Sequence, residues 1–170
     1  APGQEMTAAS ETPILEVDDL VVEFRHEHGH FAAVDGLSYK LKRGETLGVV
    51  GESGSGKSVT NLAIMGLLPR PPARIPRGKI LFHGKDLVNA SERELQKIRG
   101  NRIAMIFQEP MTSLNPYLKV GRQLTEVVEL HQGKKGEEAR QIALHMLERV
   151  GIPGAAKRID QYPHQFSGGM

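Results

Sequence analysis

The stretch that decides the fold reads Gly51-Glu52-Ser53-Gly54-Ser55-Gly56-Lys57-Ser58 and fits the pattern GxxxxGK[ST]. It follows a short, nearly continuous apolar run, Thr46 to Val50, which predicts a parallel strand buried on both faces. It precedes a predicted helix over Lys57 to Leu68. A glycine-rich turn between a buried strand and a helix is the setting that this pattern requires, so the sequence predicts an α/β fold.

The chemistry of this loop suits a chain of phosphates. Its glycines allow the backbone to bend until successive N–H groups point inward, and the first turn of the helix adds unpaired N–H groups. Lys57 carries a mobile charge that can reach the β- and γ-phosphates, and Ser58 offers a hydroxyl to Mg²⁺. Residues 51–58 therefore predict a site for a nucleoside triphosphate with Mg²⁺, although P-loop kinases and GTPases use the same loop.

Antiparallel strands are predicted on both sides of this unit. Ile14 to Phe24 and Leu37 to Leu41 alternate between apolar and polar residues. Lys79 to Leu87 is typical of a hairpin that turns at His83 and Gly84. The proline-rich stretch Pro69 to Arg77 is predicted to be an exposed connector.

Helices dominate the second half of the chain. Ser91 followed by Glu94 predicts a capping box that opens a short helix ending near Arg99. Ile103 to Phe107 predicts a second buried strand. Beyond Pro116 the pattern is helical, and one apolar face is predicted from Ala139, Ile142, Ala143, Met146, Leu147 and Val150.

The composition is that of an ordinary globular domain or a piece of one. The 170 residues include 22 basic and 20 acidic side chains, a balance that argues against a broad nucleic-acid or membrane-surface footprint. The sequence has no cysteine, which excludes a disulfide framework and a thiolate metal site. Its apolar runs fall short of the roughly 18 residues of a membrane span, so work at a membrane would need a partner. Residues 1–13 are small and polar and predict a disordered tail.

Three segments resemble motifs of the ATP-binding cassette (ABC) family. Gln108 begins the run Gln108-Glu109-Pro110-Met111-Thr112-Ser113-Leu114-Asn115-Pro116, which looks like the Q-loop. In the family this glutamine contacts Mg²⁺ and the attacking water, and the loop after it contacts the membrane subunit. The resemblance therefore implies a catalytic and metal-binding role for Gln108, beside Lys57 and Ser58.

The second segment, Tyr162-Pro163-His164-Gln165-Phe166-Ser167-Gly168-Gly169-Met170, is similar to the family signature LSGGQ. Phe166 and Met170 stand at its first and last positions, as in the peptide-importer branch. In the family this turn faces the γ-phosphate held by the other protomer. The resemblance implies that Ser167, Gly168 and Gly169 bind nucleotide in trans.

The third resemblance concerns the adenine base. Phe24 is similar to the aromatic residue that stacks on adenine from an early strand, with plain core packing as the alternative. Phe31 and Tyr39 are weaker candidates for that role. Val59 stands where many cassettes have threonine, so only its backbone N–H can serve the α-phosphate. The nucleotide-contacting set in this chain is expected to be Phe24, Gly51, Glu52, Ser53, Gly54, Ser55, Gly56, Lys57, Ser58 and Val59.

The resemblance covers Ile14 to Met170 and implies a P-loop ABC cassette, with an α/β core, an N-terminal antiparallel β subdomain and an α-helical subdomain. Residues 14–116 are assigned to the core with its β subdomain, and residues 117–170 to the helical subdomain that ends at the signature. The implied protein is the ATP-binding subunit of an importer of peptides or related small cargo, with ATP and Mg²⁺ as cofactors. Its implied partners are transmembrane permease subunits, a second cassette and, indirectly, a substrate-binding protein, but no nucleic acid. Its implied place is the cytoplasmic side of the inner membrane, as a peripheral protein.

The resemblance also implies what these residues do not contain. In the family, hydrolysis requires a Walker B strand ending in Asp, then a Glu and a His, all after the signature. The chain is therefore expected to stop before the Walker B strand and to be inactive as a 170-residue piece of a transport-coupled ATPase. The alternative is a soluble ABC-type ATPase that acts on nucleic acid or ribosomes, which the modest net charge disfavours. A P-loop kinase or GTPase would not explain Gln108 together with the Ser-Gly-Gly turn, and a nucleotide-sensing module without catalysis stays a further reading.

Overall fold

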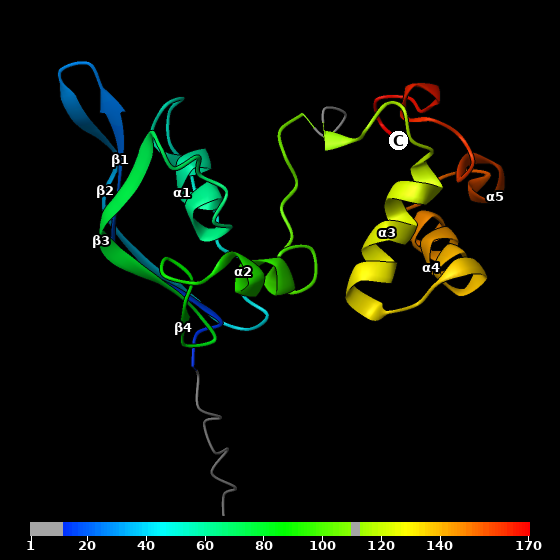
Figure 1. Cartoon of the computed structure of the whole chain (residues 1–170), viewed down its shortest axis with the longest axis horizontal. Helices are drawn as coiled ribbons and strands as arrows, with labels where there is room; N and C mark the ends of the chain where they lie inside the picture. Colours follow the sequence, from blue (N-terminus) through cyan, green and yellow to red (C-terminus); the bar gives the residue numbers. More distant parts are fainter. Residues whose placement is uncertain (1–11, 110–112) are drawn as a thin grey trace, which may run out of the picture. The chain divides into compact units, whose positions relative to one another are not determined.

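The computed structural model describes residues 12–109 and 113–170 of the chain (Figure 1). They form two compact units, one ending at Leu95 and the other spanning Gln96–Met170. Most of the predicted tail lies outside the described residues, as do positions 110–112 of the predicted Q-loop. The predicted division of the chain after residue 116 stays a prediction.

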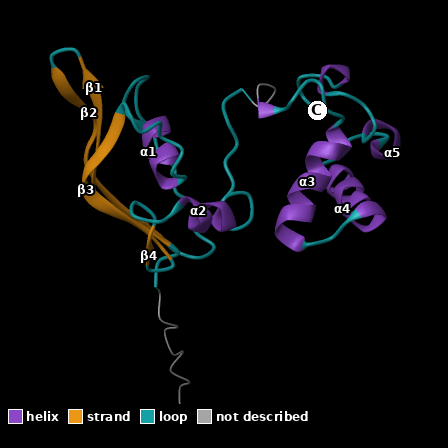
Figure 2. Cartoon of the chain, in the orientation of Figure 1, coloured by secondary structure: helices purple, strands orange, loops and turns teal. Residues whose placement is uncertain are grey.

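A four-stranded antiparallel sheet dominates the first unit, with the strand order β2-β1-β3-β4 (Figure 2). Its strands are β1 (Leu15–His26), β2 (Gly29–Leu41), β3 (Ala73–Phe82) and β4 (Lys85–Asp86). The strands predicted from alternation and the hairpin that turns at Gly84 are thereby confirmed. Most of the buried apolar side chains of the sheet come from β1 and β3, and the most deeply buried are Val17, Leu20, Val22 and Ile80.

The predicted connector Pro69 to Arg77 is wrong from Ala73 onward, because β3 begins there. Pro76 lies inside β3, at a shift in the register with β1, where Val21 faces Arg77 but Glu23 faces Arg74. A proline lacks the N–H that a regular ladder needs, so an irregular position is where a strand tolerates one.

The first helix, α1 (Lys57–Ile64), contacts β1 and β2 (Figure 1). It buries Thr60, Ala63 and Ile64. It ends earlier than predicted, since the Leu67 N–H turns back to the carbonyl of Leu62 at 2.8 Å and closes the helix with a C-terminal turn.

Two predicted buried strands are wrong in this structure: neither Thr46–Val50 nor Ile103–Phe107 forms a strand. Val50 is 93% exposed and Ile106 is 90% exposed. A parallel strand buried on both faces depends on hydrogen-bonded neighbours, and the sheet in residues 12–109 and 113–170 pairs with neither segment. Arg99 and Ile103 form an isolated bridge, which does not extend into a ladder.

Helices make up the second unit (Figure 2). They are α3 (Val120–Gln132), α4 (Gly136–Arg149), α5 (Ala155–Arg158) and the short 3-10 helix η2 (Pro163–Gln165), while α2 (Glu92–Ile98) spans the division between the units. Their core is the cluster Ala143, Leu147, Ala155 and Ile159. None of the helices in the described ranges is long and apolar enough to cross a membrane.

The apolar face predicted for α4 is confirmed at Ala139, Ala143 and Leu147, which are buried. It is wrong at Met146 and Val150, which are 45% and 73% exposed. The predicted face was too wide, because the neighbouring helices cover only a narrow stripe of α4.

A close contact joins α3 to the chain that follows α5. The Gly121 N–H donates to the carbonyl of Ile159 at 2.7 Å, and a Cβ on Gly121 would lie 2.7 Å from that same oxygen. Ile159 is fully buried. The segment that leads to the Ser-Gly-Gly turn is therefore fixed against α3 at Ile159.

The start of α2 shows the predicted pairing of Ser91 with Glu94, in part. Glu94 Oε2 accepts the Ser91 N–H at 2.8 Å and also the Ser91 hydroxyl at 2.8 Å, while Lys85 Nζ donates to Glu94 Oε1 at 2.6 Å. The serine hydroxyl donates to the glutamate instead of accepting a backbone N–H, so only one half of the capping box forms. The Lys85 bond first, and then the Ser91 bonds, lower the pKa of Glu94 from 4.5 to about 2.

We expect the Glu94 carboxyl to titrate with a pKa of about 2 in the folded protein, as measured by carbon NMR of the side chain. Because this pKa lies below the ordinary value of 4.5, the contacts stabilise the fold fully above pH 4.5, and that contribution is lost as the pH falls through about 2. Lys85→Met should raise the pKa of Glu94, whereas Lys97→Met, on the same helix, should leave it unchanged. A titration midpoint near 4.5 in the unsubstituted protein would contradict this account.

Candidate functional site

The loop of residues 51–58 bends around its own lysine. Lys57 Nζ donates to the carbonyl oxygens of Gly51 at 2.6 Å and Glu52 at 2.7 Å, and to Ser55 Oγ at 3.1 Å. The ammonium group therefore lies among oxygen atoms of the loop, all of them uncharged. An anion that entered the loop would meet a full positive charge held in place by three exchangeable hydrogen bonds.

The N-terminus of α1 offers a row of free donors beside that charge. Within the described residues, the backbone N–H groups of Gly56, Lys57, Ser58 and Val59 donate to no protein acceptor, and the first amide of the helix that does so is Thr60, to Gly56 O at 2.9 Å. Unpaired N–H groups at a helix start favour negative charge, both through hydrogen bonds and through the helix dipole.

The direction of this row is set by a contact between Gly56 and β2. Gly56 is buried, has a φ of 87°, and would place a Cβ 2.4 Å from the carbonyl oxygen of Ala33. The register of β2 shifts here, because Val34 faces Val22 whereas Ala32 faces Glu23, which leaves Ala33 as the extra residue. An irregular point of the sheet thus supports the loop, and only glycine fits there.

A cavity of about 580 Å³ adjoins the loop and α1. It is lined by residues 33–38 of β2, by Val49 and Val50, and by Ser55, Gly56, Lys57 and Thr60. Lys57 belongs to the loop and also lines the cavity. A group bound in the loop therefore has open space next to it.

Ser58 and Val59 differ in the polar groups that they offer to a ligand. Ser58 is exposed, and its hydroxyl has no hydrogen-bond partner among residues 12–109 and 113–170. Val59 is half-buried and carries no polar side-chain atom, so it has only its free backbone N–H to give. The hydroxyl of Ser58 is a hard oxygen donor of the type that Mg²⁺ accepts, and it stands one residue after the lysine.

Phe24 lies on β1 and is half-buried. It faces Phe31 across the β1–β2 pair and Ala73 across the β1–β3 pair. The rings of Phe24 and Phe31 stack with their centroids 5.8 Å apart, and Phe31 is 54% exposed. Phe24 and Phe31, two of the three aromatic candidates, therefore form one stacked pair, in which Phe31 is the more exposed ring.

The second unit holds the other two predicted motifs. Gln108 is exposed and lies two residues before the undescribed positions 110–112, and its role toward the loop stays a prediction. Ser167, Gly168 and Gly169 are exposed and form a turn closed by the Met170 N–H, which donates to Ser167 O at 2.9 Å. The backbone N–H groups of these three residues donate to no acceptor within the described chain, so the turn resembles the loop in its free donors.

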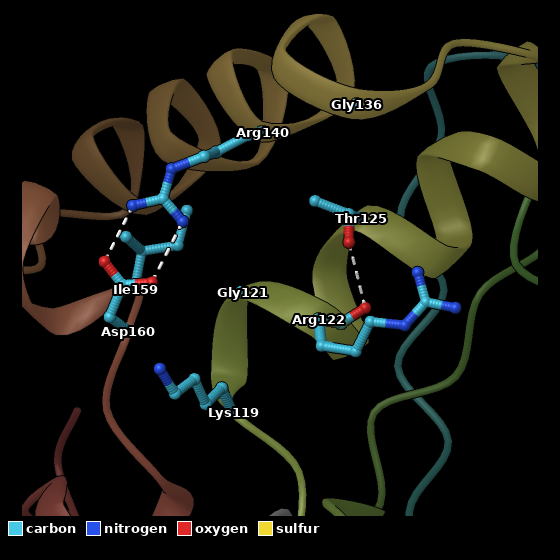
Figure 3. Close-up of a pocket in the computed structure, with 8 residues that line it drawn as sticks. All are labelled: Lys119, Gly121, Arg122, Thr125, Gly136, Arg140, Ile159 and Asp160. Carbon is cyan, nitrogen blue, oxygen red and sulfur yellow. Dashed lines mark hydrogen bonds and ion pairs between the residues drawn. The ribbon is translucent and has the colours of Figure 1, made fainter.

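An ion pair fixes the chain ahead of that turn. Arg140 on α4 donates to both carboxylate oxygens of Asp160, at 3.0 and 2.7 Å, and these bonds lower the pKa of Asp160. The pair borders a cavity of about 270 Å³, in which Lys119 points toward Asp160 while Arg122 points away from it (Figure 3).

Comparison with known proteins assigns the family. A family profile described as ABC transporter matches residues 34–170, which include the loop, Gln108 and the Ser-Gly-Gly turn. This chain belongs to the ABC transporter family.

Peptide-transport proteins are among the relatives of this cassette. It is 55% identical over 159 residues to the oligopeptide transport ATP-binding protein OppD of Bacillus subtilis, covering 94% of this chain and 44% of the relative. It is 52% identical over 157 residues to the dipeptide transport ATP-binding protein DppD of Escherichia coli, covering 92% of this chain and 48% of the relative. The chain thus spans about half the length of the curated relatives that it matches.

Solved ABC cassettes share the fold. The bacterial cassette MJ0796, in a dimeric structure with ADP and phosphate, superposes with a TM-score of 0.77 at 24% identity, over 91% of this chain and 64% of that one. The protein cbiO1 of Clostridium perfringens, part of the ABC transporter complex cbiONQ, superposes with a TM-score of 0.67 at 26% identity, over 94% of this chain and 57% of that one. The predicted ABC cassette fold, with its antiparallel β subdomain and its helices, is confirmed.

Sequence reasoning did not find several residues that shape the cassette's motifs. Ala33 supports Gly56 from a strand far away in the sequence, and no local pattern marks it. Arg140 and Asp160 are 20 residues apart, and only the packing of α4 against the later segment brings them together. The Thr60 hydroxyl, which donates to Gly56 O at 3.0 Å, could have been predicted from its position four residues after the glycine.

We expect Gly56→Ala to destabilise the cassette by about 2 to 5 kcal/mol, because the added methyl meets Ala33 and the left-handed backbone disfavours alanine. Gly54→Ala is the matched control, since Gly54 has a φ of 84° but no atom within 4 Å of the added Cβ. That control should cost only about 1 to 2 kcal/mol. Urea unfolding of the two variants measures the difference, and equal losses would show that the contact with β2 does not hold the loop.

Proposed function

We propose that this chain is the nucleotide-binding part of the ATP-binding subunit of an ABC importer of peptides or related small cargo. The observation that supports it best is the row of free amides from Gly56 to Val59 beside the Lys57 ammonium. The names of the relatives, which are oligopeptide and dipeptide transport proteins, support the cargo class and disfavour a soluble ATPase that acts on nucleic acid.

The loop fits a triphosphate for specific reasons. A Cβ on Gly51 would lie 2.5 Å from Ser55 Oγ, so a side chain at position 51 would disturb the loop where it closes on Ser55. In the proposal, Lys57 exchanges its three loop oxygens for phosphate oxygens, and residues 51–59 wrap the phosphates with backbone N–H groups. Ser58 is the proposed Mg²⁺ ligand, and the bound ion would neutralise charge on the phosphate oxygens.

The remaining predicted residues take their roles within this proposal. Phe24, in its stacked pair with Phe31, provides the aromatic surface for adenine. Gln108 would contact Mg²⁺ and the attacking water, the role that the family resemblance implies for it. Ser167, Gly168 and Gly169 contact the nucleotide of a second cassette, a role that their free backbone N–H groups support.

The proposed full-length protein hydrolyses ATP to drive uptake through transmembrane permease subunits, and receives cargo indirectly from a substrate-binding protein. It binds those permease subunits as a peripheral protein on the cytoplasmic side of the inner membrane. Residues 14–116 form its nucleotide-binding core with the β subdomain, and residues 117–170 form its helical subdomain.

Titration of the full-length protein with MgATP tests the site. Lys57→Ala should weaken binding by about 10- to 100-fold, because it removes charge-assisted hydrogen bonds to phosphate. Lys79→Ala removes an exposed lysine from β3 and should bind as the unsubstituted protein does. Ser58→Ala should weaken binding only when Mg²⁺ is present, and should match the unsubstituted protein in EDTA. Saturable binding that survives Lys57→Ala would exclude the proposed site.

Phosphate release tests a separate part of the proposal. We expect the 170-residue chain to release no phosphate from MgATP above the protein-free rate, since the family's Asp, Glu and His of hydrolysis are not among its residues. The control is the full-length protein, which should release phosphate in a manner that depends on Lys57. Lysine-dependent release by residues 1–170 would contradict the expectation.

A further inference from the structure

The Ser-Gly-Gly turn follows a segment that one arginine holds. Arg158 is the last residue of α5 and is half-buried. Its Nε donates to the carbonyl of Pro153 at 2.8 Å, and its NH1 lies 3.5 Å from Gln161 Oε1. The guanidinium carbon lies 6.0 Å from the centre of the Phe166 ring, which is a cation–π distance. Arg158 thus contacts the chain before α5, the chain after α5 and the residue that precedes Ser167.

Phe166 is the side chain next to the turn that can anchor it. The Phe166 N–H donates to Pro163 O at 3.0 Å, and Gln165 Oε1 accepts the Tyr162 N–H at 2.9 Å, so the chain through Phe166 is well bonded. Ser167, Gly168 and Gly169 carry no bulky side chain, and none of the three packs into the buried core of the described unit. The direction in which their N–H groups point therefore depends on how Phe166 is held.

An arginine suits this task in a way that a lysine does not. Its planar group can donate in its own plane to Pro153 and Gln161 while it presents a face to the Phe166 ring. An ammonium group has no such face and no fixed fork of donors. The neighbour Lys157, on the same short helix, is exposed and makes no ion pair or side-chain hydrogen bond in the described part of the chain.

We propose that Arg158 is a positioning residue that orients the Ser167–Gly169 turn by holding the Phe166 ring. The geometry that supports it is the three-way contact of the guanidinium with Pro153, Gln161 and Phe166. The consequence for nucleotide binding in trans rests on the proposed function, whereas the effect on the turn itself does not.

The first experiment measures the turn in the full-length protein without nucleotide. Nitrogen relaxation gives the order parameters of the Gly168 and Gly169 amides in the unsubstituted protein, in Arg158→Gln, in Phe166→Leu and in the double variant. We expect values near 0.85 in the unsubstituted protein and below about 0.6 in each single variant. The double variant should show no further fall, because both changes remove one contact.

Two variants separate this role from charge alone. Arg158→Lys keeps the charge and should still loosen the turn, whereas Lys157→Gln removes the neighbouring charge and should leave the order parameters unchanged. Independent effects of Arg158→Gln and Phe166→Leu, or full recovery with Arg158→Lys, would overturn the proposal. If Arg158→Gln fails to fold, Arg158→Lys with Phe166→Leu completes the same cycle.

The second experiment asks whether the turn matters for ATP. Sedimentation velocity measures self-association of the same variants at increasing MgATP, and equilibrium titration at low protein concentration measures binding to the loop. Arg158→Gln and Phe166→Leu should raise the MgATP concentration for half-association by about 2- to 5-fold, and leave loop binding unchanged. A coupled loss of order without any ATP-driven association would uphold the role of Arg158 and refute the in-trans part of the proposed function. Lost loop binding in these variants would overturn the positioning role.

Discussion

The packing of Gly56 against the carbonyl of Ala33 is the constraint on which the site in the first unit depends. It allows α1 to begin in contact with the sheet, and the left-handed backbone at Gly56 turns the chain so that the next amides are left without protein acceptors. Lys57 then folds back onto Gly51 and Glu52. Charge and free donors are thus brought together by one close backbone contact, which any side chain at position 56 would disrupt.

In the second unit, close packing likewise fixes the segment that carries free N–H groups. Gly121 lets α3 approach Ile159, and Arg140 binds Asp160 one residue later. Both contacts fix the segment that ends in the Ser167–Gly169 turn. In both units, packing away from the exposed donors sets their direction, and the donors themselves stay free for an anion. Substitutions that never touch a nucleotide are for this reason expected to alter how each motif presents its N–H groups.

The parts of the fold that could be predicted from the sequence are those with local causes. The octapeptide fixes its own turn through its glycines, the alternating strands follow from side-chain period, and the hairpin follows from Gly84. Thr46–Val50 and Ile103–Phe107 failed because a buried parallel strand is defined by neighbours, which an apolar run does not specify. For Glu94, the sequence pattern predicted the partner Ser91. It did not predict Lys85, which donates to the other carboxylate oxygen. No sequence pattern predicted the role of Arg158, because its contacts depend on how the chain turns after α5.

The claim that the free amides of the loop grip the phosphates is tested most directly by nitrogen–proton NMR of the full-length protein during titration. Addition of MgATP should shift the amide signals of Gly56 to Val59 in a saturable manner. AMP at the same concentrations should leave those of Gly56 to Ser58 nearly unmoved, because it lacks the β- and γ-phosphates and keeps only the α-phosphate that the Val59 N–H serves. Saturable shifts that spare Gly56 to Val59, or equal shifts with AMP, would contradict the account.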